Sequence, residues 1–250
     1  MTVEWRLILE QVQLEKVISD SSKAIQLNPR CADAYSNRGR AYFQLGQYDL
    51  AIADFDKAIE LDPEFAAVYS NRASAYGYKG QCDLAIADLD KAIKVNPEYA
   101  YAYYNRASAY SEKGWHDMAF GDLNKAIKYD PGFALAYNNR GWIFIISGKY
   151  DLAIADFDKA IELDPELADA YGNRGRAYIM TGQYGPAIAD LNKAIELYPG
   201  IAIGYYYRGL AYAETGNYDS AIADYKKVLD LSTDSELTKS AAQALSELEV

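Results

Sequence analysis

The stretch YDLAIADFDKAIELDP, residues 48–63, ends in a proline and returns in closely related forms along the chain. The proline that ends it recurs every 34 residues, at Pro29, Pro63, Pro97, Pro131, Pro165 and Pro199. A fixed period of this length is typical of a solenoid, in which each unit buries its apolar face only by stacking on its neighbours. The sequence therefore predicts one small structural unit repeated several times in a row.

With Ala32 taken as repeat position 1, six repeats align without a gap over residues 32–65, 66–99, 100–133, 134–167, 168–201 and 202–235. Position 4 is Tyr and position 20 is Ala in every repeat, position 8 is Gly or Ala, and position 11 is aromatic. Position 24 is Phe, Leu or Tyr, and position 27 is Ala or Val. Because residues three and four apart share a helix face, this spacing predicts two helices in each repeat.

The residues between the two helices are equally regular. Position 15 is Gly in all six repeats, which suits a left-handed residue at the end of the first helix. Position 18 is Asp in five repeats and is expected to be the N-cap of the second helix. The fifth repeat has Gly185 and Pro186 there, and Pro186 is expected at the first helical position, where proline is tolerated.

The pattern resembles the tetratricopeptide repeat, whose aromatic, Leu, Gly, Tyr, Ala, Phe, Ala and Pro signature it follows from Ala32 to Thr233. The resemblance implies an all-α fold, a right-handed α-solenoid of stacked antiparallel helix pairs. Residues 14–29 align with residues 48–63, so residues 1–31 are expected to form an irregular helix followed by the second helix of a partial repeat. Residues 236–250 are expected to form a capping helix with a polar outer face.

Charge and hydropathy exclude several classes of partner. No apolar run approaches the ~18 residues that cross a bilayer, and residues 1–13 carry charges where a signal peptide would be apolar. We therefore expect a cytoplasmic protein with no membrane partner. The net charge of −11 argues against nucleic acid, because phosphate binding relies on Lys and Arg.

The cysteines and the single histidine occupy structural positions. Cys31 stands where other repeats have an apolar residue, and Cys82 and His116 stand at position 17, which is otherwise Tyr. No His, Cys and carboxylate residues show the spacing of metal ligands, and no glycine-rich phosphate loop is present. The sequence therefore predicts no catalytic residues, no metal and no cofactor, and a protein that is not an enzyme.

Position 7 departs from the pattern of the resembled family, where Leu is common, because it is Arg in every repeat. Position 23 is Asp just as often. Since a buried charge needs a partner, we expect each Arg to pair with an Asp, although a row of ligand-binding arginines is the alternative. The two sets are Arg38, Arg72, Arg106, Arg140, Arg174 and Arg208, and Asp54, Asp88, Asp122, Asp156, Asp190 and Asp224.

Position 6 is the first candidate binding position. It is Asn in five repeats, although Asn is not favoured inside helices. The resemblance implies that positions 2, 5, 6, 9, 12 and 13 point into a concave groove, where an asparagine ladder can bond a peptide backbone through both its donor and its acceptor. The alternative is that each Asn bonds a neighbouring helix. The ladder is Asn37, Asn71, Asn105, Asn139 and Asn173.

Apolar residues gather at groove positions of the third to fifth repeats, and exposed apolar patches commonly mark binding sites. Together with the ladder they predict an adaptor that binds an extended peptide segment of a partner protein, with a large apolar anchor residue. The alternatives are a self-associating scaffold that stacks end to end or buries the Trp142 patch in a homodimer, and the interaction portion of a larger protein with a catalytic domain elsewhere. The structural alternative for Trp142 and its neighbours is that they pack on the helix of the next repeat or are covered by a dimer partner. Besides the ladder, the expected site residues are Arg40, Arg176, Tyr101, Tyr104, Asn138, Trp142, Ile145 and Ile146.

Overall fold

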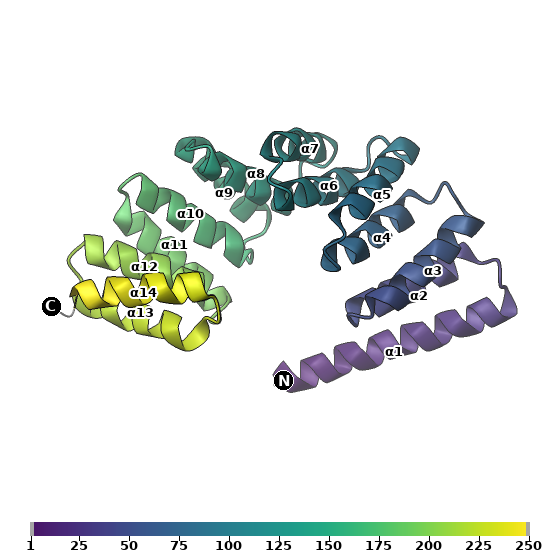
Figure 1. Ribbon diagram of the computed structural model, residues 1–250, viewed down its shortest axis with the longest axis horizontal. Helices are drawn as coiled ribbons and strands as arrows, with labels where there is room; N and C mark the ends of the chain where they lie inside the picture. Colours follow the sequence, from purple (N-terminus) through teal and green to yellow (C-terminus); the bar gives the residue numbers. More distant parts are fainter. Residues whose placement is uncertain (1–2, 249–250) are drawn as a thin grey trace. The chain divides into compact units, whose positions relative to one another are not determined.

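A computed structural model describes the backbone of residues 3–248 and the side chains of residues 11–248. Throughout this described part the only regular structure is α-helix, and the helices are shown in chain order in Figure 1. They are α1 (Val3–Leu27), α2 (Ala32–Gln44), α3 (Tyr48–Leu61), α4 (Ala66–Tyr78), α5 (Cys82–Val95), α6 (Ala100–Glu112), α7 (His116–Tyr129), α8 (Ala134–Ile146), α9 (Tyr150–Leu163), α10 (Ala168–Met180), α11 (Tyr184–Leu197), α12 (Ala202–Glu214), α13 (Tyr218–Leu231) and α14 (Ser235–Leu248).

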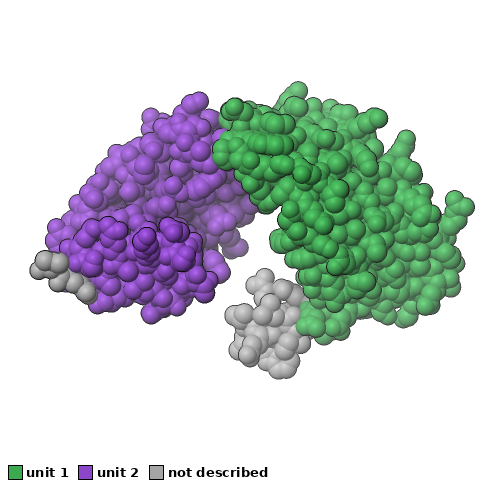
Figure 2. All heavy atoms as spheres, in the orientation of Figure 1, with its two compact units in different colours: residues 1–131 green, residues 132–250 purple. Residues whose placement is uncertain are grey.

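The helices form a solenoid of antiparallel pairs, one pair per repeat, and the all-α fold expected from the sequence is confirmed. The chain divides into two compact units, residues 1–131 and 132–250, coloured separately in Figure 2. In unit 1 the second helices α3 and α5 pack on the next first helices, α4 and α6. The same packing in unit 2 joins α9 to α10 and α11 to α12.

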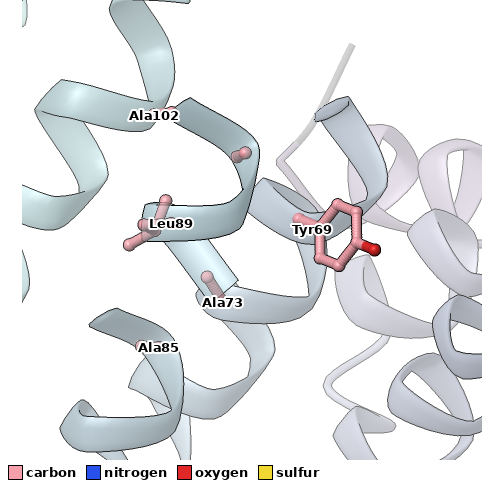
Figure 3. Close-up of a cluster of buried hydrophobic side chains, with 6 residues drawn as sticks. Tyr69, Ala73, Ala85, Leu89 and Ala102 are labelled. Atoms are coloured by element: carbon pink, nitrogen blue, oxygen red, sulfur yellow. The ribbon is translucent and has the colours of Figure 1, made fainter. Parts of the chain in front are cut away.

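The core of each pair follows the predicted spacing. Every Ala at position 20 is buried, and so is the large residue at position 24, as with Ala51 and Phe55. A Cβ added to Gly39, at position 8, would lie 2.7 Å from the Phe55 ring, so a small residue is needed where the helices meet. Figure 3 shows the corresponding cluster around Tyr69 and Leu89 in the second repeat.

The glycine at position 15 ends each first helix with a positive φ, between 69° and 76°, as the sequence predicts. The expected N-caps are wrong. The second helices begin at position 17, so Gln47 is the N-cap of α3, and Asp49 lies inside the first turn and pairs with Lys79 of the next repeat. Likewise α11 begins at Tyr184, which puts Pro186 third in the helix, where its missing N–H still costs no intrahelical bond.

Replacing Gly46 with Ala is expected to lower the free energy of unfolding by about 1 kcal/mol, because a Cβ strains a left-handed residue. Gly77 is the matched control, since it lies inside α4 and a Cβ added there would meet nothing within 4 Å. There Ala should stabilise by about 0.5–1 kcal/mol through helix propensity. In chemical denaturation the midpoint should therefore fall for Gly46→Ala and rise for Gly77→Ala. Midpoints that shift in the same direction would contradict the turn geometry.

Both ends of the chain differ from a full repeat. A single helix, α1, runs without a break from Val3 to Leu27, where an irregular helix followed by a second one was expected. At the other end α14 packs on α13 with Ala241 buried between them, in the stretch expected to cap the last repeat. The last two residues of that expected helix, 249–250, lie outside the described residues.

The arginines at position 7 are paired as expected in all six repeats. Each guanidinium donates from Nε and Nη2 to both carboxylate oxygens of the Asp at position 23, at 2.6–2.8 Å. These hydrogen bonds and the aspartate charge outweigh the effect of burial and raise the pKa of Arg106, so the arginine stays charged. The arginines therefore hold the two helices of a repeat together.

The third guanidinium nitrogen, Nη1, joins neighbouring repeats. In the second and third repeats it donates to position 25 of the preceding repeat, from Arg72 to Asp56 and from Arg106 to Asp90. Arg174 makes the same link to Asp158 in unit 2. In the first and sixth repeats the acceptor is neutral, Ser22 for Arg38 and Asn192 for Arg208.

Candidate binding face of the first helices

The predicted site residues lie on the first helices of the repeats, which are α2, α4 and α6 in unit 1 and α8, α10 and α12 in unit 2. In each unit, the face that carries positions 2, 6 and 9 of these helices is called the first-helix face below. Among the described residues, the α1–α2 and α2–α6 cavities open on this face in unit 1 and the Trp142 cavity opens on it in unit 2.

The α1–α2 cavity of unit 1 has a volume of about 380 Å³. Of the predicted site residues it contains Asn37 and Arg40, both exposed on α2. Its full lining is Leu14, Val17, Asp20 and Ser21 from α1 and Asn37, Arg40, Ala41 and Gln44 from α2.

The α2–α6 cavity of unit 1 has a volume of about 370 Å³ and is shared by α2, α4 and the start of α6. It brings together three predicted residues, Arg40, Asn71 and Tyr101. The Tyr101 ring lies between the rings of Tyr99 and Tyr104, with centroids 6.4 Å and 6.1 Å away. Burial raises the pKa of Tyr99, so this phenol stays neutral and can donate a hydrogen bond beside Arg40.

The Trp142 cavity of unit 2 has a volume of about 270 Å³ and a mostly apolar lining. The Arg176 guanidinium lies 4.8 Å from the Trp142 ring centroid and 5.3 Å from that of Tyr207, so one cation is in contact with aromatic rings from both neighbouring helices. Burial raises the pKa of Tyr207, while the charge of Arg176 opposes that rise. Ile201 and Ile203 complete an apolar wall.

The asparagine ladder is divided between two roles. Asn105 donates to Ser70 Oγ at 3.1 Å, and Asn173 donates to Asn138 Oδ1 at 3.1 Å, each reaching position 5 of the preceding first helix. Asn139 accepts from the side chain of Asn138 at 3.3 Å. These hydrogen bonds agree with the alternative in which each asparagine bonds a neighbouring helix.

Asn37 and Asn71 differ from the other asparagines of the ladder. Their carboxamides make no side-chain hydrogen bond within residues 11–248, and each lines a cavity. They are therefore the two members of the ladder whose carboxamides keep both donor and acceptor for another molecule.

Two predicted site residues are not accessible. Ile145 is 6% exposed and packs in the core of unit 2 with Phe157 and Ala177, because position 12 turns toward the second helix and the next repeat. Asn138 is buried as well. Trp142 and Ile146 remain exposed at the surface of α8.

The Trp142 cavity depends on residues that the sequence analysis did not select, above all Gly172 and Gly204. A Cβ at Gly172 would meet nothing nearer than Ala194, at 4.0 Å, so the missing side chain leaves the cavity open. Position 5 carries Ser, Tyr or Asn in the other repeats. The change to Gly beside an exposed Trp is the signal that could have located this cavity.

The side chains able to do chemistry do not cluster. No group of three His, Cys, Asp or Glu residues in the described part could hold a metal ion. The Cys82 thiol lies 3.1 Å from Glu112 Oε2, and this hydrogen bond raises the pKa of the thiol, which keeps it protonated. Of the helices described, none is both long and apolar enough to cross a bilayer.

Comparison with protein families gives matches along most of the chain. Models described as tetratricopeptide repeat match residues 32–65, 100–133, 134–167 and 173–236, and a TPR-repeat model matches residues 74–114. No match was found among curated proteins.

Several solved structures are similar to the chain. A chain of the APC/C hetero-tetramer Cut9–Hcn1 covers 96% of it with a TM-score of 0.85 and 20% identity, and the present chain spans 47% of that one. YrrB, described as a TPR protein with an unusual peptide-binding site, is 26% identical with a TM-score of 0.59, over 76% of this chain and 97% of YrrB. MamA is 28% identical with a TM-score of 0.58, over 72% of this chain and 96% of MamA.

Proposed function

Because the chain belongs to the tetratricopeptide-repeat family, we propose that it is an adaptor that binds an extended segment of a partner protein on its first-helix face. Proteins of this family are generally non-catalytic interaction modules. YrrB, which resembles the chain over most of its length, is described as having a peptide-binding site, and this supports a peptide as the ligand.

The Trp142 cavity is the observation that carries the proposal. An apolar side chain of the partner enters between Trp142, Ile203 and Tyr207, where it leaves water against apolar and aromatic surface. Arg176 borders the same cavity and donates to a backbone carbonyl or an acidic side chain next to that anchor. The partner segment therefore combines a large apolar residue with a neighbouring acceptor.

The α2–α6 cavity supports backbone recognition in unit 1. Asn71 has a donor and an acceptor to offer, and Arg40 and Tyr101 flank it. Since a peptide backbone presents one donor and one acceptor per residue, these side chains hold a segment whatever its sequence.

Filling the Trp142 cavity tests the proposal. Gly172→Leu places a side chain in the open space of the cavity, and binding of peptides with a large apolar residue should fall by at least about tenfold, the equivalent of about 1.4 kcal/mol. Gly77→Leu is the matched control, because Gly77 is also helical and borders open space but lines none of the three cavities. A peptide array probed with both variants gives the answer: equal binding by the two would remove the cavity from the proposal.

A further inference from the structure

The C-terminal half of α1 is a second helix without its first helix. Continuing the repeat numbering backwards puts Leu14 at position 17, Val17 at position 20 and Asp20 at position 23. This part of α1 contacts the following repeat as other second helices do, since α1 packs on α2. Ser22, at position 25, accepts a hydrogen bond from Arg38, just as Asp56 accepts one from Arg72. One face of α1 is thus used as in every other repeat.

The face of α1 that a first helix would cover is open. Val17 is 41% exposed, whereas the alanines at the same position of the six repeats are at most 2% exposed. Asp20 is exposed and makes no ion pair within the described side chains, whereas the six other aspartates at its position are buried and bonded bidentately to Arg. Both residues lack the neighbour that all their counterparts have.

The α1–α2 cavity lies where the absent helix would lie. A first helix such as α4 contacts its own second helix, α5, and the next first helix, α6. The cavity is lined in the same way, by α1 as the second helix and by positions 6, 9, 10 and 13 of α2 as the next first helix. Asn37 stands at this border and makes no side-chain hydrogen bond within residues 11–248, whereas Asn105 and Asn173 each bond the preceding first helix.

The described chain does not fold back to cover this face. Val12 occupies position 15, where every full repeat has a glycine with positive φ. At Val12 the helix continues through the position of the turn, because α1 is unbroken from Val3 to Leu27. None of the described residues therefore forms a first helix that covers this face.

We propose that the face of α1 formed by Val17 and Asp20, at the edge of the α1–α2 cavity, binds an amphipathic helix of a partner protein that carries an arginine. The arginine pairs with Asp20 in the manner of the six internal pairs, and the apolar side of the partner helix covers Val17. Ser21, which stands at position 24 in place of a large residue, is 9% exposed and lines the α1–α2 cavity next to them.

The test uses the full chain and a peptide with the sequence of α4, Ala66–Tyr78, whose only charged side chain is Arg72. The peptide is held helical by a side-chain staple, its helicity is checked by circular dichroism, and binding is followed by fluorescence anisotropy. Saturable binding is expected. Asp20→Lys should weaken it by at least about tenfold, and a peptide with Arg72→Glu should recover affinity for that variant.

Asp33→Lys is the matched control, because Asp33 is an aspartate of α2 outside the cavity and its change should leave the affinity unaltered. Absence of saturable binding by the helical peptide overturns the proposal. So does an equal loss for Asp20→Lys and Asp33→Lys, or failure of the charge exchange to recover affinity. A dimer of the chain that dissociates on Asp20→Lys would overturn it too, by assigning the face to a second copy. The Trp142 cavity shares no residue with this face, so either proposal can fail without the other.

Discussion

Arg106→Leu is expected to lower the free energy of unfolding by about 3 kcal/mol, the usual cost of leaving a buried charge without its partner. Asp122, which is 4% exposed, would lose two charge-assisted hydrogen bonds from Arg106, of 2.6 Å and 2.8 Å, and would find no water to replace them. Asp90 of the preceding repeat would lose its bond as well. Urea denaturation followed by circular dichroism measures the loss.

Replacing both members of the pair, Arg106 and Asp122, with Leu should cost much less than the single change, because no charge is then left buried. Arg40→Leu is the control for the loss of an arginine in a first helix, since Arg40 is exposed and belongs to no ion pair of the described residues. Additive losses in the double-mutant cycle would mean that the pair is not a unit.

Trp142→Ala should weaken the binding of peptides that carry an apolar anchor by at least ~2 kcal/mol, because a central aromatic dominates the energy of an interface. Arg176 would lose the ring beneath its guanidinium at the same time. Peptides without the anchor should bind the variant and the parent chain alike. Titration calorimetry with the two kinds of peptide measures both affinities.

Trp115→Ala is the matched control for Trp142→Ala, since Trp115 is also exposed and lies outside the three cavities, at the start of α7. An equal effect of the two substitutions would point to general adhesion of apolar peptides. If instead Trp142→Ser turns a dimer into a monomer in light scattering, the Trp142 surface is a contact between copies of the chain and the self-associating scaffold is the better description.

The repeat pattern predicts the structural features that depend only on the spacing of residues along the chain. Tyr, Ala and Gly at fixed positions determine two helices and a turn, and the equal numbers of Arg and Asp predict their pairing, because a buried charge leaves few choices. The N-cap at position 18 was wrong for a related reason. An Asp before a helix and an Asp in its first turn look the same in sequence, and both favour the helix N-terminus.

The candidate site was less predictable because it depends on absent neighbours and on small side chains, which the repeat pattern does not specify. The asparagines share one position, yet Asn105 has Ser70 within reach and Asn37 has no first helix before it. Sequence also assigns Ile145 and Ile146 to one surface, but only the second is exposed. Cavities arise from a side chain that is small relative to its neighbours, as at Gly172, and a repeat signature does not record that contrast.

The double attachment of each arginine affects how the chain loses structure. In a solenoid, stability is close to a sum of terms for single repeats and terms for the contacts between neighbours. Arg72, Arg106 and Arg174 contribute to both at once, since each bonds the aspartate of its own repeat and a carboxylate of the one before. Where Ser22 and Asn192 replace that carboxylate, the link is neutral and weaker. Amide protons in α1 and in the last pairs should accordingly exchange with solvent by local fraying, while those next to the charged links exchange only when several repeats open together.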